Sequence, residues 1–130
     1  MSDQARPTLE GNICQENKDC GIAYFGTAGG TVRQNTCRDN KGHGIYVGEQ
    51  AQPTLESNTY QGNTLDGIAY RNRAGGVAHS NECTGNGENG IYVSFTARPT
   101  LKDNRCWGNK GRDVNDQRLF SKLVHRPLIY

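Results

Sequence analysis

Two consecutive stretches of the chain carry the same 23-residue pattern, GIYVGEQAQPTLESNTYQGNTLD (residues 44–66) and GIAYRNRAGGVAHSNECTGNGEN (residues 67–89). The pattern continues in both directions without an insertion, and two sets of asparagines mark it. The first set is Asn12, Asn35, Asn58, Asn81 and Asn104. The second set is Asn17, Asn40, Asn63, Asn86 and Asn109. A fixed period over most of a chain indicates a solenoid, here with five copies of one coil.

A second period, twice as long, is superimposed on the first. Pro7, Pro53 and Pro99 occupy one position in alternate coils, and Gly30 and Gly76 occupy that position in the coils between them. The triplets Ile-Ala-Tyr and Ile-Tyr-Val alternate in the same way. The chain is therefore a duplicated pair of slightly different coils.

Short strands fit this repeat better than helices do. Apolar residues come in runs of two or three, bounded by Gly, Asn or Pro-Thr, which form turns. Within a run the faces alternate, so Ile45 and Val47 are predicted to point inward and Tyr46 outward. Each coil should contain three strands, and stacked coils should form three parallel sheets around a shared interior. Leucine-rich repeats have a similar period, but in the coils of this chain leucine recurs at only one position.

The order Gly-Ile-x-(Tyr/Val), alanine, Pro-Thr-Leu-x-x-Asn, cysteine and asparagine resembles the repeat of right-handed parallel β-helices of the pectate-lyase-like superfamily. It is similar to the short coils of β-helix F-box proteins and of bacterial β-helix repeat proteins. The resemblance covers residues 5–114 and implies an all-β solenoid of five 23-residue coils. It implies little about function, because the superfamily includes lyases, hydrolases, epimerases, adhesins and non-catalytic binding proteins. The calcium-binding carboxylates of its lyases and the aspartate group of its polygalacturonase-like hydrolases have no match here.

Equivalent positions in successive coils predict the interior. The isoleucine position is expected to form a buried stack of Ile22, Ile45, Ile68, Ile91 and Val114. The asparagines are expected at turns, where this residue tolerates left-handed backbone, with their amides hydrogen-bonded from coil to coil.

Four of the five cysteines share one position of the coil: Cys14, Cys37, Cys83 and Cys106. Stacked neighbours have nearly parallel Cβ vectors, which is a poor geometry for a disulfide. We therefore expect buried free thiols, which favour a reducing, cytoplasmic location. Cys20 lies outside this column near a turn and is the thiol expected to react. The spacing matches no metal site, so no metal or other cofactor is predicted.

The composition excludes several classes of partner. The chain has 130 residues, 33% of them hydrophobic, a mean hydropathy of −0.82 and a net charge of +2. This charge balance predicts neither a nucleic acid nor a membrane surface as partner. No apolar segment has the length that a membrane-spanning helix requires, and the first residues lack a secretory signal.

Two tyrosines and one acid–base pair are the candidate site residues. Tyr46 and Tyr92 are expected to point outward with Ala69 between them, about 9.6 Å apart by strand stacking. Such a pair could stack on sugar rings or anchor a partner protein. His43 and Asp66 occupy one turn position in successive coils and are the weaker, catalytic candidates.

The repeat ends after Val114. Residues 115–126 are predicted to form a capping helix, with Asn115-Asp116 as its N-terminal cap, followed by an apolar tail at 127–130. The whole chain, 1–130, is expected to be one domain, with the coils at 5–114. The N-terminal end has no such cap, so we expect a homodimer or small oligomer.

These observations favour a non-catalytic β-helix scaffold or protein-interaction module that self-associates. Its partner would be another copy of the chain or another protein. The alternative is a carbohydrate-binding or polysaccharide-degrading protein that uses the outward tyrosines. Fold resemblance alone supports this alternative.

Overall fold

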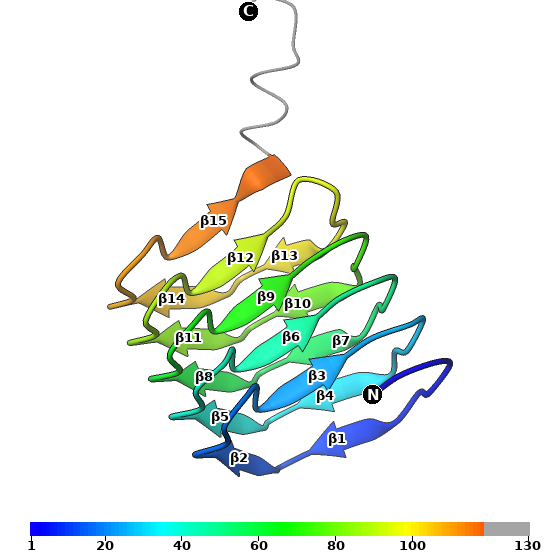
Figure 1. The fold of residues 1–130 in the computed structure, drawn as a ribbon, viewed down its shortest axis with the longest axis horizontal. Coiled ribbons are helices and arrows are strands. Elements are labelled where there is room, and N and C mark those ends of the chain that lie inside the picture. The colour runs from blue at the N-terminus through cyan, green and yellow to red at the C-terminus, as the bar shows by residue number, and fades with distance from the viewer. Residues whose placement is uncertain (119–130) are drawn as a thin grey trace, which may run out of the picture.

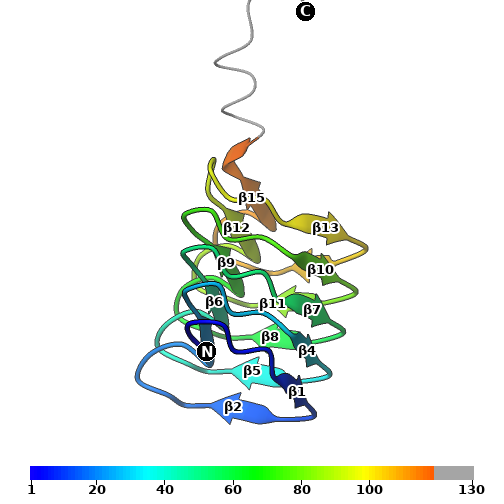
Figure 2. The same cartoon turned by 90° about the vertical axis from the view of Figure 1, so that its right-hand side faces the viewer.

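The computed structural model describes residues 1–118, which form fifteen three-residue strands in three parallel sheets (Figures 1 and 2). Sheet A contains β1 (Thr8–Glu10), β4 (Thr31–Arg33), β7 (Thr54–Glu56), β10 (Val77–His79) and β13 (Thr100–Lys102). Sheet B contains β2 (Ile13–Gln15), β5 (Thr36–Arg38), β8 (Thr59–Gln61), β11 (Glu82–Thr84) and β14 (Arg105–Trp107). Sheet C contains β3 (Ile22–Tyr24), β6 (Ile45–Val47), β9 (Ile68–Tyr70), β12 (Ile91–Val93) and β15 (Val114–Asp116).

Each strand pairs with the strand 23 residues away in sequence, as in the pairing of Ile45 with Ile68 and of Ile68 with Ile91. Consecutive strands of one coil belong to different sheets, so the chain winds once around the interior in each coil (Figure 2). The predicted all-β parallel solenoid of five coils is confirmed.

The three sheets enclose an interior that is filled by one layer of inward-pointing side chains from each sheet. Ile45, Val47 and Ile68 are fully buried there, as predicted from the alternation in sheet C. The cysteine column also points inward, and Cys37 and Cys83 are fully buried free thiols. These columns pack as one continuous core, except for Val114, which was predicted to be buried but is 44% exposed at the end of the described coils.

Two asparagine ladders join the coils at the turns on either side of sheet B. In the first ladder, the Asn58 N–H and Nδ2 donate to Asn81 Oδ1 at 2.9 and 3.0 Å, and Nδ2 also donates to Val32 O at 2.8 Å. The predicted amide ladder is therefore present. The left-handed residue, however, is the one before each asparagine, such as Ser57 (φ 55°), because this leaves the asparagine amide facing the next coil.

The C-terminal end of the described chain differs from the prediction. Asn115 and Asp116, predicted to begin a helix, instead belong to β15 and pair with Tyr92 and Val93 of β12. The backbone bonds of sheet C continue for one more strand, which is why the helix does not begin there. Asp116 Oδ1 does accept the Arg118 N–H at 3.0 Å, as an N-cap would. The rest of the predicted helix, 119–126, and the tail at 127–130 lie outside the described residues.

Candidate functional site

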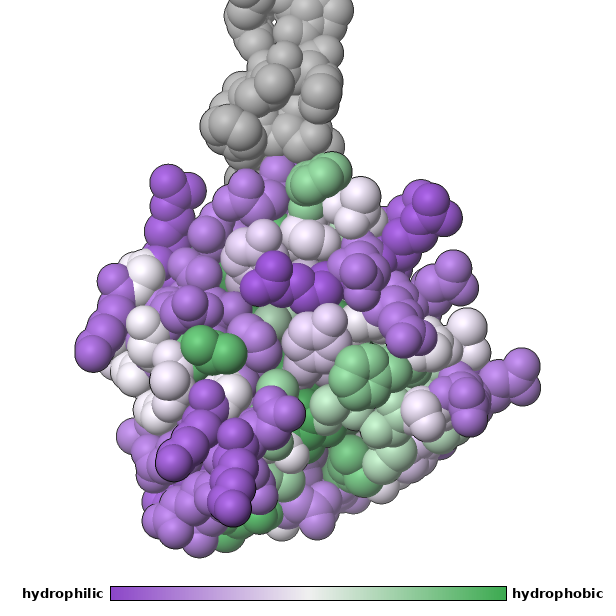
Figure 3. Space-filling model, in the orientation of Figure 1, coloured by the Kyte–Doolittle hydropathy of each residue, from purple (hydrophilic) through white to green (hydrophobic). Residues whose placement is uncertain are grey.

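The outward face of sheet C carries both candidate tyrosines. Tyr46 is the middle residue of β6 and Tyr92 that of β12, and each is half-buried. Ala69 of β9 lies between them and is fully buried. Figure 3 shows this side of the molecule, where pale and green surface lies between strongly hydrophilic margins.

Tyr46 packs among other aromatic rings. Its ring centroid lies 5.4 Å from that of Phe25 and 5.9 Å from that of His43. The ring also covers Gly48, so closely that a Cβ at that position would clash with it. Tyr46 therefore packs against Phe25, His43 and Gly48 on this face.

Tyr92 borders a hollow of about 420 Å³ at the other end of the face. The Arg71 guanidinium stacks over the Tyr92 ring, 4.3 Å from its centroid. Glu88 and Lys110, from the turns between sheets B and C, line the same hollow, as does Asp66. The site thus combines one aromatic ring with charges of both signs.

His43 and Asp66 lie together, but both are engaged with backbone groups. His43 Nδ1 accepts the Asp66 N–H at 3.1 Å, and Asp66 Oδ1 accepts the Asn89 N–H at 2.8 Å. Asn89 Oδ1 in turn accepts the Arg112 N–H at 2.9 Å. These contacts form a third ladder, in which each side chain accepts from the following coil and not from the preceding one.

Both side chains of this pair are little exposed and accept backbone N–H groups. His43 is 8% exposed and Asp66 1% exposed, so a substrate can reach little of either side chain. Because Nδ1 accepts a backbone N–H, the proton of the neutral imidazole is on Nε2. Asp66 Oδ2 lies 3.3 Å from Nδ1 and has no hydrogen-bond partner within residues 1–118. The pair links the turns of successive coils.

Sequence reasoning did not identify three residues that closely follow strands of sheet C, two of them exposed phenylalanines and the third a half-buried arginine. Phe25 directly follows β3 and is 41% exposed, and Phe95, two residues beyond β12, is 66% exposed. Arg71 directly follows β9, at the position that Phe25 has in its own coil. The position directly after each strand of sheet C was the sequence signal that could have identified Phe25 and Arg71. We call Phe25, Tyr46, Arg71, Tyr92 and Phe95 together the aromatic–arginine face.

Residues 1–118 offer neither a metal-binding cluster nor a membrane-spanning helix. No group of three His, Cys, Asp or Glu side chains within residues 1–118 is arranged to hold a metal ion. Residues 1–118 contain no helix that is long and apolar enough to cross a membrane.

Comparison with known proteins identifies the fold family. The family model described as "Right handed beta helix region" matches residues 25–117, more than half of the chain. No curated protein and no solved structure matches the chain significantly. The matched region begins beside β3 and ends just after β15, so it covers the strands whose register is described above. The chain therefore belongs to the right-handed β-helix family.

Proposed function

We propose that this β-helix is a non-catalytic protein-interaction module that binds its partner through the aromatic–arginine face. The observation that carries the proposal is the Arg71 guanidinium stacked 4.3 Å from the centre of the half-buried Tyr92 ring. Tyrosine and arginine are the residues most often found as energetic hot spots of protein interfaces.

The scaffold supports the proposal by holding this face rigidly. Tyr46 and Tyr92 are both on strands of one parallel sheet, and Arg71 directly follows another. Side chains that are already ordered lose less conformational entropy when a partner binds. The exposed ring of Phe25, 5.4 Å from that of Tyr46, and the exposed ring of Phe95, two residues beyond β12, add apolar area.

The pair His43 and Asp66 supports the non-catalytic part of the proposal. A general base must reach the proton that it removes, directly or through one water. Here the imidazole Nδ1 accepts a backbone N–H, and the carboxylate belongs to a residue that is 1% exposed. Both groups serve the backbone of neighbouring turns.

Affinity capture with matched variants tests the proposal. The full chain, the Arg71→Ala/Tyr92→Ala variant and the control Arg105→Ala/Trp107→Ala are immobilised and exposed to extract of the source organism. The control removes a second arginine–aromatic pair, 5.5 Å from cation to ring centroid, on sheet B. A captured protein is then purified and its affinity measured directly.

The expected partner binds the wild-type chain and the sheet B control equally. Its affinity for the face variant should be at least about 30-fold weaker, the loss typical of hot-spot residues. A purified partner that binds the face variant as tightly as the wild type contradicts the proposal.

Carbohydrate binding is the second candidate function. It is favoured by the hollow of about 420 Å³ beside Tyr92, which combines an aromatic ring with Glu88 and Lys110. A glycan array, together with a reducing-sugar assay on pectin-type polymers, distinguishes the two candidates. Array binding that is lost in the Tyr92→Ala variant would favour the carbohydrate function over the protein-interaction function.

A further inference from the structure

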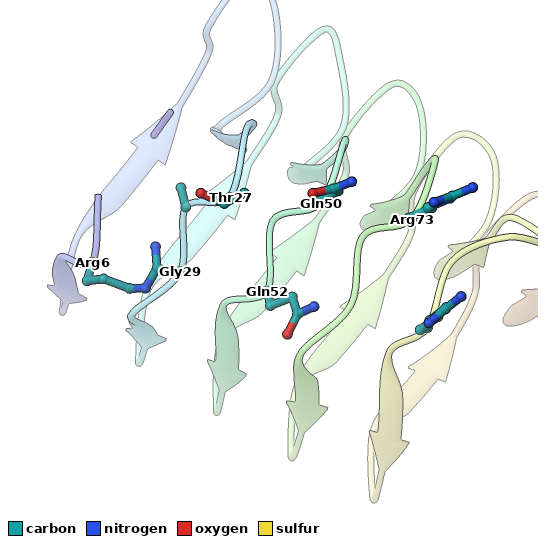
Figure 4. A pocket seen from close by; sticks show the side chains of 8 residues that line it. Arg6, Thr27, Gly29, Gln50, Gln52 and Arg73 are labelled. Atoms are coloured by element: carbon teal, nitrogen blue, oxygen red, sulfur yellow. The ribbon is translucent and has the colours of Figure 1, made fainter. Parts of the chain in front are cut away.

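A second hollow, separate from the aromatic–arginine face, lies along the turns that connect sheet C to sheet A (Figure 4). It has a volume of about 500 Å³ and runs across several coils, from Arg6 in the first to Arg98 in the fifth. Gln50 and Gln52 line it in the middle coil, and Arg73 lines it in the fourth. We call it the arginine groove.

The double period of the sequence shapes this groove. Arg6, Gly29, Gln52, Gly75 and Arg98 occupy one position in successive coils, so long side chains alternate with glycines. Gly29 and Gly75 are buried and have no side chain to fill the space between the long ones. The Arg6 side chain extends over Gly29, where a Cβ would lie 3.3 Å from Arg6 Cδ and Nε. Long side chains are therefore attached at every second coil, and that of Arg6 lies along the groove over the glycine of the next coil.

The charge of the groove is unbalanced. Arg6, Arg73 and Arg98 line it, and none of its lining residues is acidic. None of these three arginines forms an ion pair within residues 1–118. Glu49 borders an adjacent hollow, where its carboxylate accepts the Gly26 N–H at 2.7 Å. Three exposed guanidinium groups without acidic partners suit a ligand that carries carboxylates.

The spacing of the row favours a particular peptide conformation. The backbone positions of Arg6, Gln52 and Arg98 are two coils apart, which corresponds to about 9.6 Å for two strand spacings. A polyproline II helix rises about 3.1 Å per residue with three residues per turn, so every third side chain recurs at about 9.3 Å. Side chains on one face of a β-strand recur at only about 6.7 Å and would not match the row.

The uncharged groups that line the groove also suit a peptide ligand. Gln50 and Gln52 each offer one amide donor group and one acceptor, which complement the unpaired backbone groups of a polyproline II segment. No aromatic side chain lines the groove, whereas single-stranded nucleic acids and sugars are commonly held by stacking on such rings.

We propose that the arginine groove binds an acidic peptide in the polyproline II conformation, with carboxylates at positions i and i+6 against Arg6 and Arg98. A polar residue at position i+3 then faces Gln52. The site is independent of the aromatic–arginine face, so either proposal can fail without the other.

Synthetic peptides test this assignment directly. The probe is the capped peptide Glu-Pro-Pro-Gln-Pro-Pro-Glu with a fluorophore, titrated with the full chain by fluorescence anisotropy at low salt. The variants are Arg6→Gln and Arg98→Gln, singly and together. The matched control is Arg38→Gln, which removes the same charge from β5 on sheet B.

Each single groove variant should weaken binding about threefold to fivefold, since an exposed charge pair contributes modestly, and the double variant should weaken it at least about tenfold. A peptide with its two glutamates four residues apart should bind more weakly than the probe, and Arg38→Gln and Tyr92→Ala should leave binding unchanged. No binding of the probe, equal weakening by Arg38→Gln, or equal binding of the two peptides overturns the proposal. Tighter binding of an oligouronate or an oligonucleotide of matched charge also overturns it, in favour of that class of polyanion.

Discussion

Three tyrosine hydroxyls of the interior, those of Tyr24, Tyr60 and Tyr70, are buried without a hydrogen-bond partner in residues 1–118. The same burial raises the pKa of Tyr60 well above its ordinary value, because the phenolate would lose its hydration. A buried hydroxyl that makes no hydrogen bond costs the protein its desolvation free energy. The ring of Tyr60 therefore occupies the cysteine position of its coil, and its hydroxyl is left without a hydrogen bond.

Replacement of Tyr60 by phenylalanine should stabilise the protein. We expect the free energy of unfolding to rise by about 1 kcal/mol, because the ring keeps its packing and the unpaired hydroxyl is removed. Urea denaturation followed by circular dichroism measures it, with Tyr92→Phe as the half-buried control that should change little. A lower urea midpoint for Tyr60→Phe would mean that the hydroxyl makes a stabilising contact.

The surroundings of the thiols lead us to expect another order of reactivity than the sequence alone suggested. Cys20 was expected to be the reactive thiol, but Cys14, Cys20 and Cys106 are all half-buried. Burial is the main cause that raises the pKa of Cys20, and the neighbouring Asp19 raises it further. A hydrogen bond from Cys83 lowers the pKa of Cys106. The thiolate, the nucleophilic form, is thus more abundant at Cys106 than at Cys20 at the same pH.

Alkylation with iodoacetamide near pH 8 should therefore modify Cys106 faster than Cys20. Cys37 and Cys83, which are fully buried and have raised pKa values, should react only after unfolding. Peptide mapping by mass spectrometry gives the rate at each position. Faster modification of Cys20 than of Cys106 contradicts this order.

The asparagine ladders hold successive coils together by buried hydrogen bonds, as the hydrophobic core does by apolar packing. Removal of the Asn58 amide by Asn58→Ala takes the acceptor from the Asn35 N–H and the donor from Val32 O, both in a buried region. We expect a loss of about 3 kcal/mol in the free energy of unfolding, since each buried group left unpaired costs about 1–3 kcal/mol.

Asn12→Ala in the same ladder is the control for this loss. Asn12 is exposed in the first coil, and its side chain makes only the bond from Nδ2 to Asn35 Oδ1 within the described chain. Its loss should be below about 1 kcal/mol. Equal destabilisation by the two substitutions would show that ladder position does not determine the cost.

The elements could be predicted to the extent that the repeat is regular. Alternation was sufficient to place Ile45 and Val47 inward and Tyr46 outward, because neighbouring residues of a strand point to opposite faces. The extension of β15 beyond Val114 was not predicted, since Asn and Asp have low β-propensity and Asn115-Asp116 is held in the strand by its pairing with β12. The repeat also predicted that His43 and Asp66 would be adjacent. It could not predict that Nδ1 accepts a backbone N–H or that Arg71 stacks on Tyr92, because both depend on side-chain rotamers.

We propose that the protein self-associates, because the first coil exposes apolar side chains. Ile13 is 66% exposed there, and Cys14 and Ile22 of the same coil are only half-buried. A second copy that covers this end would remove apolar surface from water. Light scattering at micromolar concentration should give about twice the 14.3 kDa mass of the chain. A mass equal to that of one chain excludes this assembly under those conditions.

Hydroxyl-radical footprinting of the complex with the captured partner measures whether the aromatic–arginine face is the surface that the partner covers. Tyr92 and the 66% exposed Phe95 are on the proposed face, while Trp107, 49% exposed on sheet B, is an internal control. We expect oxidation of Tyr92 and Phe95 to fall when the partner binds, with oxidation of Trp107 unchanged. If Trp107 is protected while Tyr92 and Phe95 are oxidised as fast as in the free protein, the partner does not bind the aromatic–arginine face.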